Sequence, residues 1–231
     1  IIGVVVPVTS RLERIRKTSI ALYQEAIKIN ASIYHFHDPE FLPFALKLTK
    51  LGKRVIYDVH EDVPRQILAK FWIPKLLRKL TSRIFEKYEN YVASRLTGII
   101  AATPFIRDRF VMVNPRTIDI NNYPIIKEYN PNLYTRDKER SVCYVGGLNE
   151  NRGISTIINA VNKTDVRLNL AGEYDPESYK LALEKLNGWK NVKEYGFVNP
   201  TEVRDILIRS IAGLVTLKPL VNYLDSLPVK M

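Results

Sequence analysis

Short apolar runs rich in β-branched residues recur along the chain, and stretches with helical spacing separate them. The runs predict nine strands, at residues 2–6, 32–36, 54–58, 98–102, 117–120, 142–145, 166–171, 192–195 and 213–217. Apolar residues three and four apart predict helices at residues 13–29, 40–51, 75–95, 153–162, 177–187 and 201–210. This alternation predicts an α/β fold, in which helices cover both faces of parallel sheets.

The alternation is interrupted once, by a stretch of Asn, Pro, Tyr and charged residues that follows neither period. The stretch is too long for an ordinary loop within a compact domain. We therefore expect an N-terminal domain over residues 1–122, a linker over 123–140 and a C-terminal domain over 141–231.

Both ends of the chain are abrupt. Ile1 lies inside an apolar run, and Met231 comes where a helix should follow the turn at residues 226–228. We therefore expect a fragment in which both domains are incomplete.

The charge is unevenly distributed. The net charge is +11, and residues 1–126 hold 20 Lys and Arg against 11 Asp and Glu. Such a surface favours nucleic acid, anionic lipid or phosphorylated small molecules. No zinc-finger spacing, recognition helix or RNA-binding signature is present, so we do not expect a nucleic-acid partner. One cysteine and no apolar span of 18 residues make the cytoplasm the expected compartment.

Two histidine-containing segments follow the second and third predicted strands. His35, His37 and Asp38 lie in the first, which places them at the carboxyl edge of a parallel sheet, where α/β folds bind ligands. Because Asp38-Pro39 ends the strand, the two histidines would not share a face, so we expect no metal site. His60 follows the next strand together with Glu61. It either contacts substrate and handles a proton or bonds a neighbouring carboxylate.

The helix predicted at residues 75–95 is basic and amphipathic. Its apolar stripe and its cations lie side by side, with the stripe formed by Leu76, Leu77, Leu80, Ile84, Phe85, Tyr88 and Val92. Two interpretations are open: the helix rests on an anionic membrane surface, or it packs on the core with a solvated basic face.

A glycine turn follows the strand predicted at residues 142–145. Gly146 and Gly147 allow backbone amides to approach a phosphate, and Arg152 can add a charged contact before the next helix. The spacing is not that of a dinucleotide or Walker loop, so a plain tight turn is an equal alternative.

Five segments in this order resemble glycosyltransferase family 4, specifically bacterial enzymes of surface-polysaccharide clusters. They are residues 34–40, 55–61, 101–106, 144–148 and 222–230. The resemblance implies the GT-B fold, with two Rossmann-like domains, an acceptor domain first and a nucleotide-sugar domain second. It also implies a retaining transfer of a sugar from a nucleotide-diphosphate donor to a hydroxyl acceptor, without a metal or other cofactor.

The resemblance also assigns roles to particular residues. His60 and Asp225 would lie around the transferred sugar as catalytic residues. The donor-binding residues would be Gly146, Gly147, Arg152, Phe197, Val198, Ser226, Leu227 and Lys230. The acceptor side would include His37, Asp38 and Glu61.

The chain departs from the family pattern in two places. Many members have Arg where Gly147 stands, which leaves Arg152 to carry more of the contact with the diphosphate. The family's second acid would fall beyond Met231.

Several alternatives stay open on the sequence. A nucleotide-sugar epimerase of the same fold and an inactive binding fragment are the rivals of a hexosyltransferase. The expected partners are a nucleotide-sugar donor and a sugar or lipid-linked sugar acceptor, in polysaccharide or glycolipid biosynthesis. Helix 75–95 would add peripheral contact with the inner face of an anionic membrane.

Overall fold

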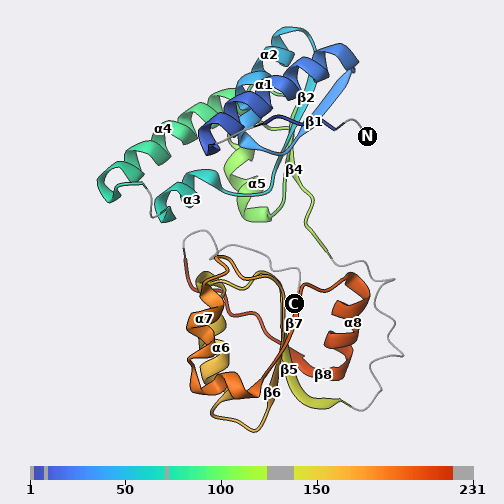
Figure 1. Ribbon diagram of the computed structural model, residues 1–231. Coiled ribbons are helices and arrows are strands. Elements are labelled where there is room, and N and C mark those ends of the chain that lie inside the picture. Colours follow the sequence, from blue (N-terminus) through green and yellow to red (C-terminus); the bar gives the residue numbers. More distant parts are fainter. Residues whose placement is uncertain (1–2, 8–9, 71–72, 124–137, 221–231) are drawn as a thin grey trace. The chain divides into compact units, whose positions relative to one another are not determined.

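The computed structural model describes residues 3–7, 10–70, 73–123 and 138–220, drawn as ribbon in Figure 1. The chain divides into two compact units, residues 1–122 and 123–231. Most of the predicted linker, residues 124–137, lies outside the described residues. Its last two residues belong to a strand, because β5 already begins at Glu139.

The first unit is a four-stranded parallel sheet in the order β1-β2-β3-β4. Its elements in chain order are α1 (Arg11–Ile29), β1 (Ile33–Phe36), the 3-10 helix η1 (Pro39–Phe41), α2 (Leu42–Lys50), β2 (Arg54–Val59), α3 (Val63–Ala69), α4 (Lys75–Ala93), β3 (Gly98–Ala101), α5 (Pro104–Val111) and β4 (Thr117–Asp119). Helix α2 packs on β2 and α4, whereas α5 packs on β3 and β4.

Tyr57 lies at the centre of the first unit's core. Its ring stacks on Phe36, the residue paired with it across β1 and β2, at a centroid distance of 4.7 Å. Phe110 of α5 meets the same ring edge-on at 6.2 Å. These three buried aromatic side chains join the sheet to its covering helix, and such pairs stabilise beyond the apolar area they bury.

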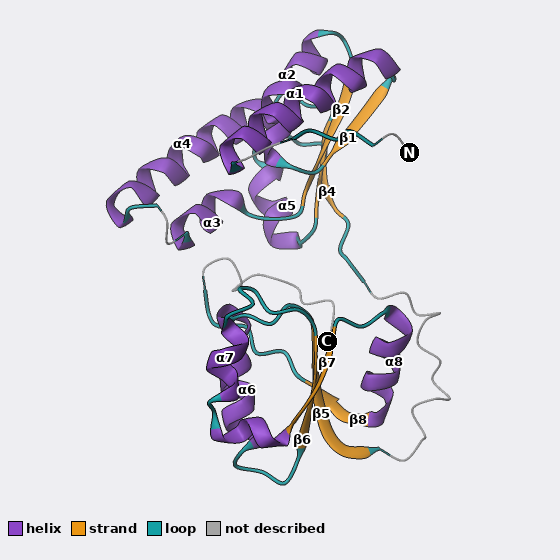
Figure 2. Ribbon diagram, viewed as in Figure 1, coloured by secondary structure: helices purple, strands orange, loops and turns teal. Residues whose placement is uncertain are grey.

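The second unit repeats the pattern with the strand order β7-β6-β5-β8, again all parallel. Its elements are β5 (Glu139–Val145), η4 (Glu150–Arg152), α6 (Ile154–Val161), β6 (Arg167–Ala171), α7 (Tyr179–Glu184), η5 (Asn187–Asn191), β7 (Val192–Gly196), α8 (Pro200–Arg209) and β8 (Ser210–Gly213). Figure 2 shows α6 and α7 on one face of this sheet and α8 on the other. The second unit is therefore a three-layer α/β sandwich.

A buried polar group connects the strands of the second sheet. The Asn169 amide nitrogen donates to the hydroxyls of Ser141 and Ser210, at 3.0 and 3.1 Å, and its oxygen accepts from Tyr195 at 3.4 Å. The four residues lie on or at the start of four different strands. Because each buried polar group has a partner, the network specifies strand pairing without leaving an unsatisfied donor on Asn169.

The predicted α/β fold is confirmed, with two exceptions among the strands. Residues 3–6 form no strand, because they pair with none of the described strands and Val5 is exposed. The last strand is Ser210–Gly213 instead of residues 213–217, since α8 ends at Arg209 and pairing with β5 begins at once.

Two helices, α3 and α5, were not predicted. Both are short, at 7 and 8 residues, and α3 shows no extended apolar stripe. Capping explains why they form: Asp62 and Thr103 each accept a hydrogen bond from a backbone N–H three residues on, and a Pro lies in each first turn.

Candidate functional sites

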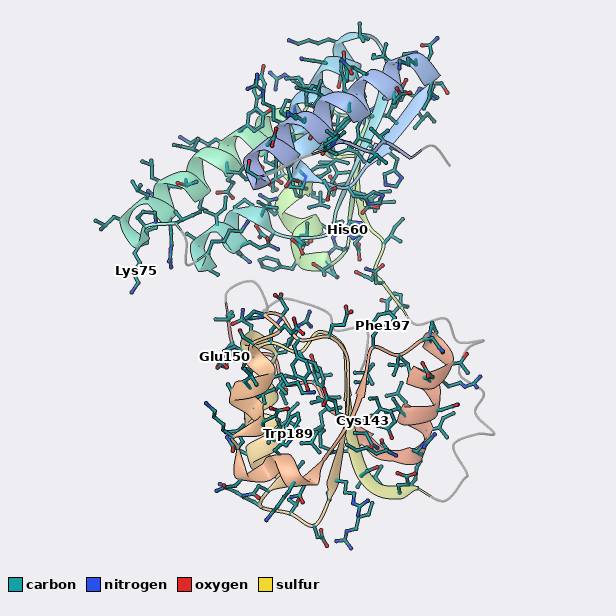
Figure 3. The ribbon with its side chains drawn as sticks, in the orientation of Figure 1. His60, Lys75, Cys143, Glu150, Trp189 and Phe197 are labelled. Atoms are coloured by element: carbon teal, nitrogen blue, oxygen red, sulfur yellow. The ribbon has the colours of Figure 1, made fainter. Side chains whose placement is uncertain are left out.

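Three histidines converge on one carboxylate at the carboxyl edge of the first sheet. Phe36 pairs with Tyr57 in the parallel register of β1 and β2, so the residues that follow each strand lie side by side. This places His37 next to Asp58, the last but one residue of β2, and His60 one position beyond that strand. Figure 3 shows His60 at this end of the sheet.

The distances define a compact cluster around Asp58. Its Oδ2 lies 3.1 Å from His35 Nε2 and 3.4 Å from His37 Nδ1, and its Oδ1 lies 3.2 Å from His60 Nε2. His37 Nδ1 and His60 Nε2 are 2.9 Å apart. The three rings are exposed, whereas the Asp58 side chain is only 16% exposed. The cluster is therefore open to a ligand and anchored on a rigid strand.

One premise of the sequence analysis is wrong. The strand does end at Phe36, yet the rings of His35 and His37 stack at 4.9 Å and face the same carboxylate. Asp38 still has extended backbone geometry, so His35 and His37, two residues apart, project to the same side and both reach Asp58. Sequence reasoning grouped the histidines with Asp38 instead. The parallel pairing of the two strand ends is the signal that would have placed His37 beside Asp58.

The other predicted acceptor-side residues lie outside this cluster. Asp38 is exposed and precedes η1 without a side-chain hydrogen bond to it. Glu61 is exposed and bonds the amide of Gln66. Of the three predicted acceptor-side residues, only His37 contacts His60 and Asp58.

A buried ionic group lies behind the first sheet. The Glu89 carboxylate of α4 is fully buried and accepts hydrogen bonds from Arg109 at 2.7 Å and Tyr57 at 3.2 Å. Burial raises the pKa of Glu89, and the Arg109 guanidinium opposes that shift. Burial and the Glu89 charge also raise the pKa of Tyr57 far above its ordinary value. The group ties α4, α5 and β2 together.

Glycines end three neighbouring strands of the second sheet. Gly146, Gly172 and Gly196 follow or end β5, β6 and β7 with φ values of +141°, +143° and +68°. A Cβ on Gly172 would lie 1.8 Å from the carbonyl oxygen of Gly146. The chain therefore needs bare backbone here, and L side chains rarely adopt these φ values.

The glycine turn leads into a capped helical turn that contains Arg152. Asn149 accepts from the Arg152 backbone N–H at 3.1 Å, and Thr216 donates to the Arg152 carbonyl at 2.8 Å. Gly153 follows at φ +70°, where a Cβ would meet the Thr216 carbonyl at 2.3 Å. The backbone of Arg152 is thus fixed at the carboxyl edge of the sheet, and its side chain is half-buried.

The structure separates Phe197 from Val198. The Phe197 ring, just after β7, is 76% exposed, and Figure 3 shows it at that strand's end. Val198 packs against the buried cluster of Cys143, Ala171 and Ile206. Phe197 is therefore available to a ligand, while Val198 packs under the loop. Four predicted residues, Asp225, Ser226, Leu227 and Lys230, lie outside the described residues.

Helix α4 exposes the first part of its apolar stripe. Leu76, Leu80 and Ile84, each four residues apart, are 94%, 56% and 60% exposed, whereas Val92 near the end of the helix is buried. Exposed cations stand beside them in a parallel row, at Lys75, Lys79, Arg83 and Lys87. Figure 3 labels Lys75 at the start of this helix. Packing thus accounts for the face with Ser82, Phe85 and Val92, and not for the exposed row.

The chain belongs to glycosyltransferase family 4. The model of Glycosyltransferase Family 4 matches residues 1–120, just over half of the chain. Among curated proteins no match was found.

Solved structures show the same fold at low sequence identity. WaaG, a glycosyltransferase involved in lipopolysaccharide biosynthesis, superposes with a TM-score of 0.63 at 13% identity, covering 93% of this chain and 61% of WaaG. Anabaena HepE in complex with UDP and glucose superposes with a TM-score of 0.57 at 15% sequence identity, covering 90% of this chain and 58% of HepE. A proposed UDP-N-acetylglucosamine 2-epimerase from Listeria monocytogenes superposes with a TM-score of 0.52 at 12% sequence identity, covering 90% of this chain and 58% of that protein.

The fold is therefore of the GT-B type, with two Rossmann-like domains. The chain spans about three-fifths of the length of these structures. Within the part of the chain that the structure describes, no helix is long and apolar enough to cross a membrane.

Proposed function

We propose that this chain is part of a retaining glycosyltransferase that moves a hexosyl group from a nucleotide-diphosphate sugar to a hydroxyl acceptor. The observation that carries the proposal is the family 4 match over the first unit. The second unit supports it, since the exposed Gly147 of its glycine turn lies at the sheet edge where α/β folds bind phosphates.

The donor chemistry is assigned to the second unit. The amide of Gly147 and the charge of Arg152 would stabilise the diphosphate as it leaves, and Phe197 would stack on the nucleotide base. Lys230, Ser226 and Leu227 would add donor contacts, and Asp225 would contact the sugar. UDP is the favoured nucleotide, because HepE, which shares the fold, was solved with UDP.

The acceptor chemistry is assigned to the first unit. His60 lies 3.2 Å from the Asp58 carboxylate, which orients the ring. His60 would thereby take part in moving the acceptor hydroxyl proton. His37 adds a polar group at the same edge, with Asp38 and Glu61 further out. A sugar or lipid-linked sugar is the proposed acceptor, in polysaccharide or glycolipid synthesis.

Calorimetric titration with UDP tests the donor site. Arg152→Ala should lower UDP affinity by at least about tenfold, since a hydrogen bond to a charged group contributes roughly 1.5–3 kcal/mol. Arg167→Ala is the matched control, because Arg167 is exposed at the opposite end of β6. Absence of UDP binding, or equal affinity in both variants, would contradict the assignment.

Product analysis separates transfer from epimerisation. The likeness to the Listeria protein favours a nucleotide-sugar 2-epimerase as the second candidate. Incubation with a labelled UDP-sugar and no acceptor should leave the sugar's stereochemistry unchanged at C2 if the chain is a transferase. A new epimer in the NMR spectrum would overturn the transferase proposal.

We further propose that α4 holds the protein on an anionic membrane at the inner, cytoplasmic face. Its exposed apolar row would enter the headgroup region while the adjacent cations meet acidic lipids. The protein should sediment with phosphatidylcholine vesicles containing about 30% phosphatidylglycerol far more than with pure phosphatidylcholine.

A triple variant tests which face binds. Leu76→Ser, Leu80→Ser and Ile84→Ser together should abolish sedimentation, and because these side chains are exposed the fold should persist. Leu181→Ser, an exposed leucine of α7, is the control and should bind like the wild type. Equal binding by the triple variant would exclude this face.

A further inference from the structure

All three histidines of the chain meet at one carboxylate. The sequence contains only three, and His35, His37 and His60 each lie within 3.4 Å of Asp58. They arrive from the ends of two neighbouring strands. The rings are exposed, so core packing does not explain why they gather.

The spacing of the ligand atoms fits a small tetrahedral metal ion. Ligands about 2.0–2.1 Å from a tetrahedral Zn²⁺ lie about 3.3–3.4 Å from one another. The corresponding distances to Asp58 Oδ2 are 3.1 Å for His35 Nε2 and 3.4 Å for His37 Nδ1. The ligand atoms of these three residues all lie within 4.8 Å of one another. We propose that His35, His37 and Asp58 bind one divalent transition metal ion of the Zn²⁺ class.

The donor set decides the class of metal. Two imidazole nitrogens and one carboxylate oxygen suit zinc and its transition-metal neighbours, whereas Mg²⁺ and Ca²⁺ take oxygen ligands. Both imidazole nitrogens face the same oxygen of Asp58. Lone pairs that converge in this way repel one another unless a proton or a metal ion lies between them, and one metal ion satisfies all three atoms.

His60 takes a different role in this site. Its Nε2 lies 3.2 Å from Asp58 Oδ1, the oxygen that neither of the other histidines contacts, and 2.9 Å from His37 Nδ1. A hydrogen bond to the free oxygen of a ligating carboxylate fixes its orientation, as outer-shell partners do in metal sites. Three protein ligands leave a coordination position for water or a substrate oxygen, at the sheet edge where ligands bind.

This inference departs from the expectation that the histidine segment holds no metal. That expectation rested on His35 and His37 not sharing a face, and their rings stack at 4.9 Å. The metal site shares His37, Asp58 and His60 with the proposed acceptor site, but metal binding is measured without donor or acceptor and so is tested apart from the transfer reaction. Failure of either proposal leaves the other standing.

Zinc titration against a chromophoric chelator tests the proposal, with protein prepared without a histidine tag. One Zn²⁺ should bind per chain at micromolar or lower concentration, and excess Mg²⁺ should not displace it. Co²⁺ in its place should give the visible absorption of a tetrahedral site. A wild type that binds Zn²⁺ no more tightly than a His35→Ala/His37→Ala double variant would overturn the proposal.

Single variants test the ligand assignment. His35→Ala, His37→Ala and Asp58→Asn should each weaken Zn²⁺ binding by at least about 100-fold, and His60→Ala by roughly tenfold, as for an outer-shell partner. Glu61→Gln is the control, since its carboxylate bonds Gln66, and should bind like the wild type. Circular dichroism checks folding. Weaker Zn²⁺ binding in His60→Ala together with unchanged binding in His35→Ala would contradict the assignment.

Discussion

The two units end their parallel sheets in different chemistry. At the edge of the first sheet, imidazole and carboxylate side chains gather around Asp58. At the edge of the second, three strands end in glycines at positive φ, and backbone lies against backbone between Gly172 and Gly146. The first edge presents side chains to a ligand, whereas at the second the amides of Gly146 and Gly172 bond neighbouring backbone and Gly147 is exposed.

The two edges therefore differ in how strongly a substitution should disturb folding. The side chains of the histidine cluster are exposed, so they can change without disturbing the core of the first unit. At the second edge Gly172 leaves no room for a Cβ, whereas nothing lies within 4 Å of the Cβ position of Gly147, the glycine assigned to the donor. Substitution of Gly172 should therefore affect stability, whereas substitution of the histidine cluster should affect ligand binding.

The largest effect should come from Gly172→Ala. Its Cβ would lie 1.8 Å from the Gly146 carbonyl oxygen, so the two strand ends must move apart, at φ +143°. We expect a loss of more than about 4 kcal/mol in unfolding free energy, at the extreme of single substitutions. Urea denaturation followed by Trp189 fluorescence measures it, in a Trp72→Phe background so that one tryptophan reports on the second unit.

Gly147→Ala is the matched control. Nothing lies within 4 Å of its Cβ position, and its φ is not positive. It should unfold at the wild-type urea concentration. Equal losses in the two glycine variants would show that the strand ends move freely.

Arg109→Met should have the next largest effect, in the first unit. It leaves the Glu89 carboxylate buried without its cation, which costs about 3 kcal/mol or more. Denaturation, monitored through the hydrogen exchange of α4 peptides, measures the loss of unfolding free energy. Arg107→Met, which removes a partly exposed arginine paired with Asp108 and Asp119, should leave the midpoint nearly unchanged. An equal shift in both variants would contradict this role for Arg109.

Phe197→Ala should change ligand binding and not folding. The ring is 76% exposed, so its loss leaves the core intact. Loss of base stacking should lower UDP affinity about tenfold, since such stacking contributes roughly 1–3 kcal/mol. Calorimetry measures this. Leu181→Ala, another exposed apolar residue of the second unit, should bind UDP like the wild type. Unchanged affinity in Phe197→Ala would remove the ring from the donor site.

The smallest expected effect is a pH dependence of stability in the first unit. Burial raises the pKa of Glu89, so the folded state holds its proton more tightly than the unfolded state. The stabilisation from this group is present below pH about 4.5 and declines as pH rises through the raised value. Between about pH 4.5 and pH 7.5, the wild type should lose more stability than Glu89→Gln. Exposed Glu61→Gln should keep the wild-type slope, and identical slopes in all three would contradict the shift.

Sequence patterns were sufficient for the architecture. Alternation of apolar runs and helical stripes located closely seven of the eight strands found in the described residues, because parallel strands between covering helices favour apolar runs. The eighth strand begins three residues before its predicted position. The apolar run at residues 2–6 was predicted as a strand, but residues 3–6 form none, since a strand also needs a partner. The short helices α3 and α5 were missed because their stability comes from caps and packing.

Only part of each site could be predicted from the sequence. The glycines of the donor edge and the histidines of the acceptor edge could be named, because turns and sheet edges restrict residue type. Which carboxylate the histidines would meet could not be named. Asp38 and Asp58 are both aspartates, so residue type does not distinguish them as partners of His37. Only the register of β1 against β2 places Asp58 beside His37.

The sequence by itself determined the family, the order of strands and helices, and the positions of the glycine turn and the basic helix, since each depends on residues close together in the chain. The tertiary structure alone decided that three histidines share one carboxylate, that Glu89 is buried against Arg109, and that the apolar row of α4 is exposed. Each of these depends on which strand or helix lies beside which, and the periodicity of a single element carries no record of its neighbours.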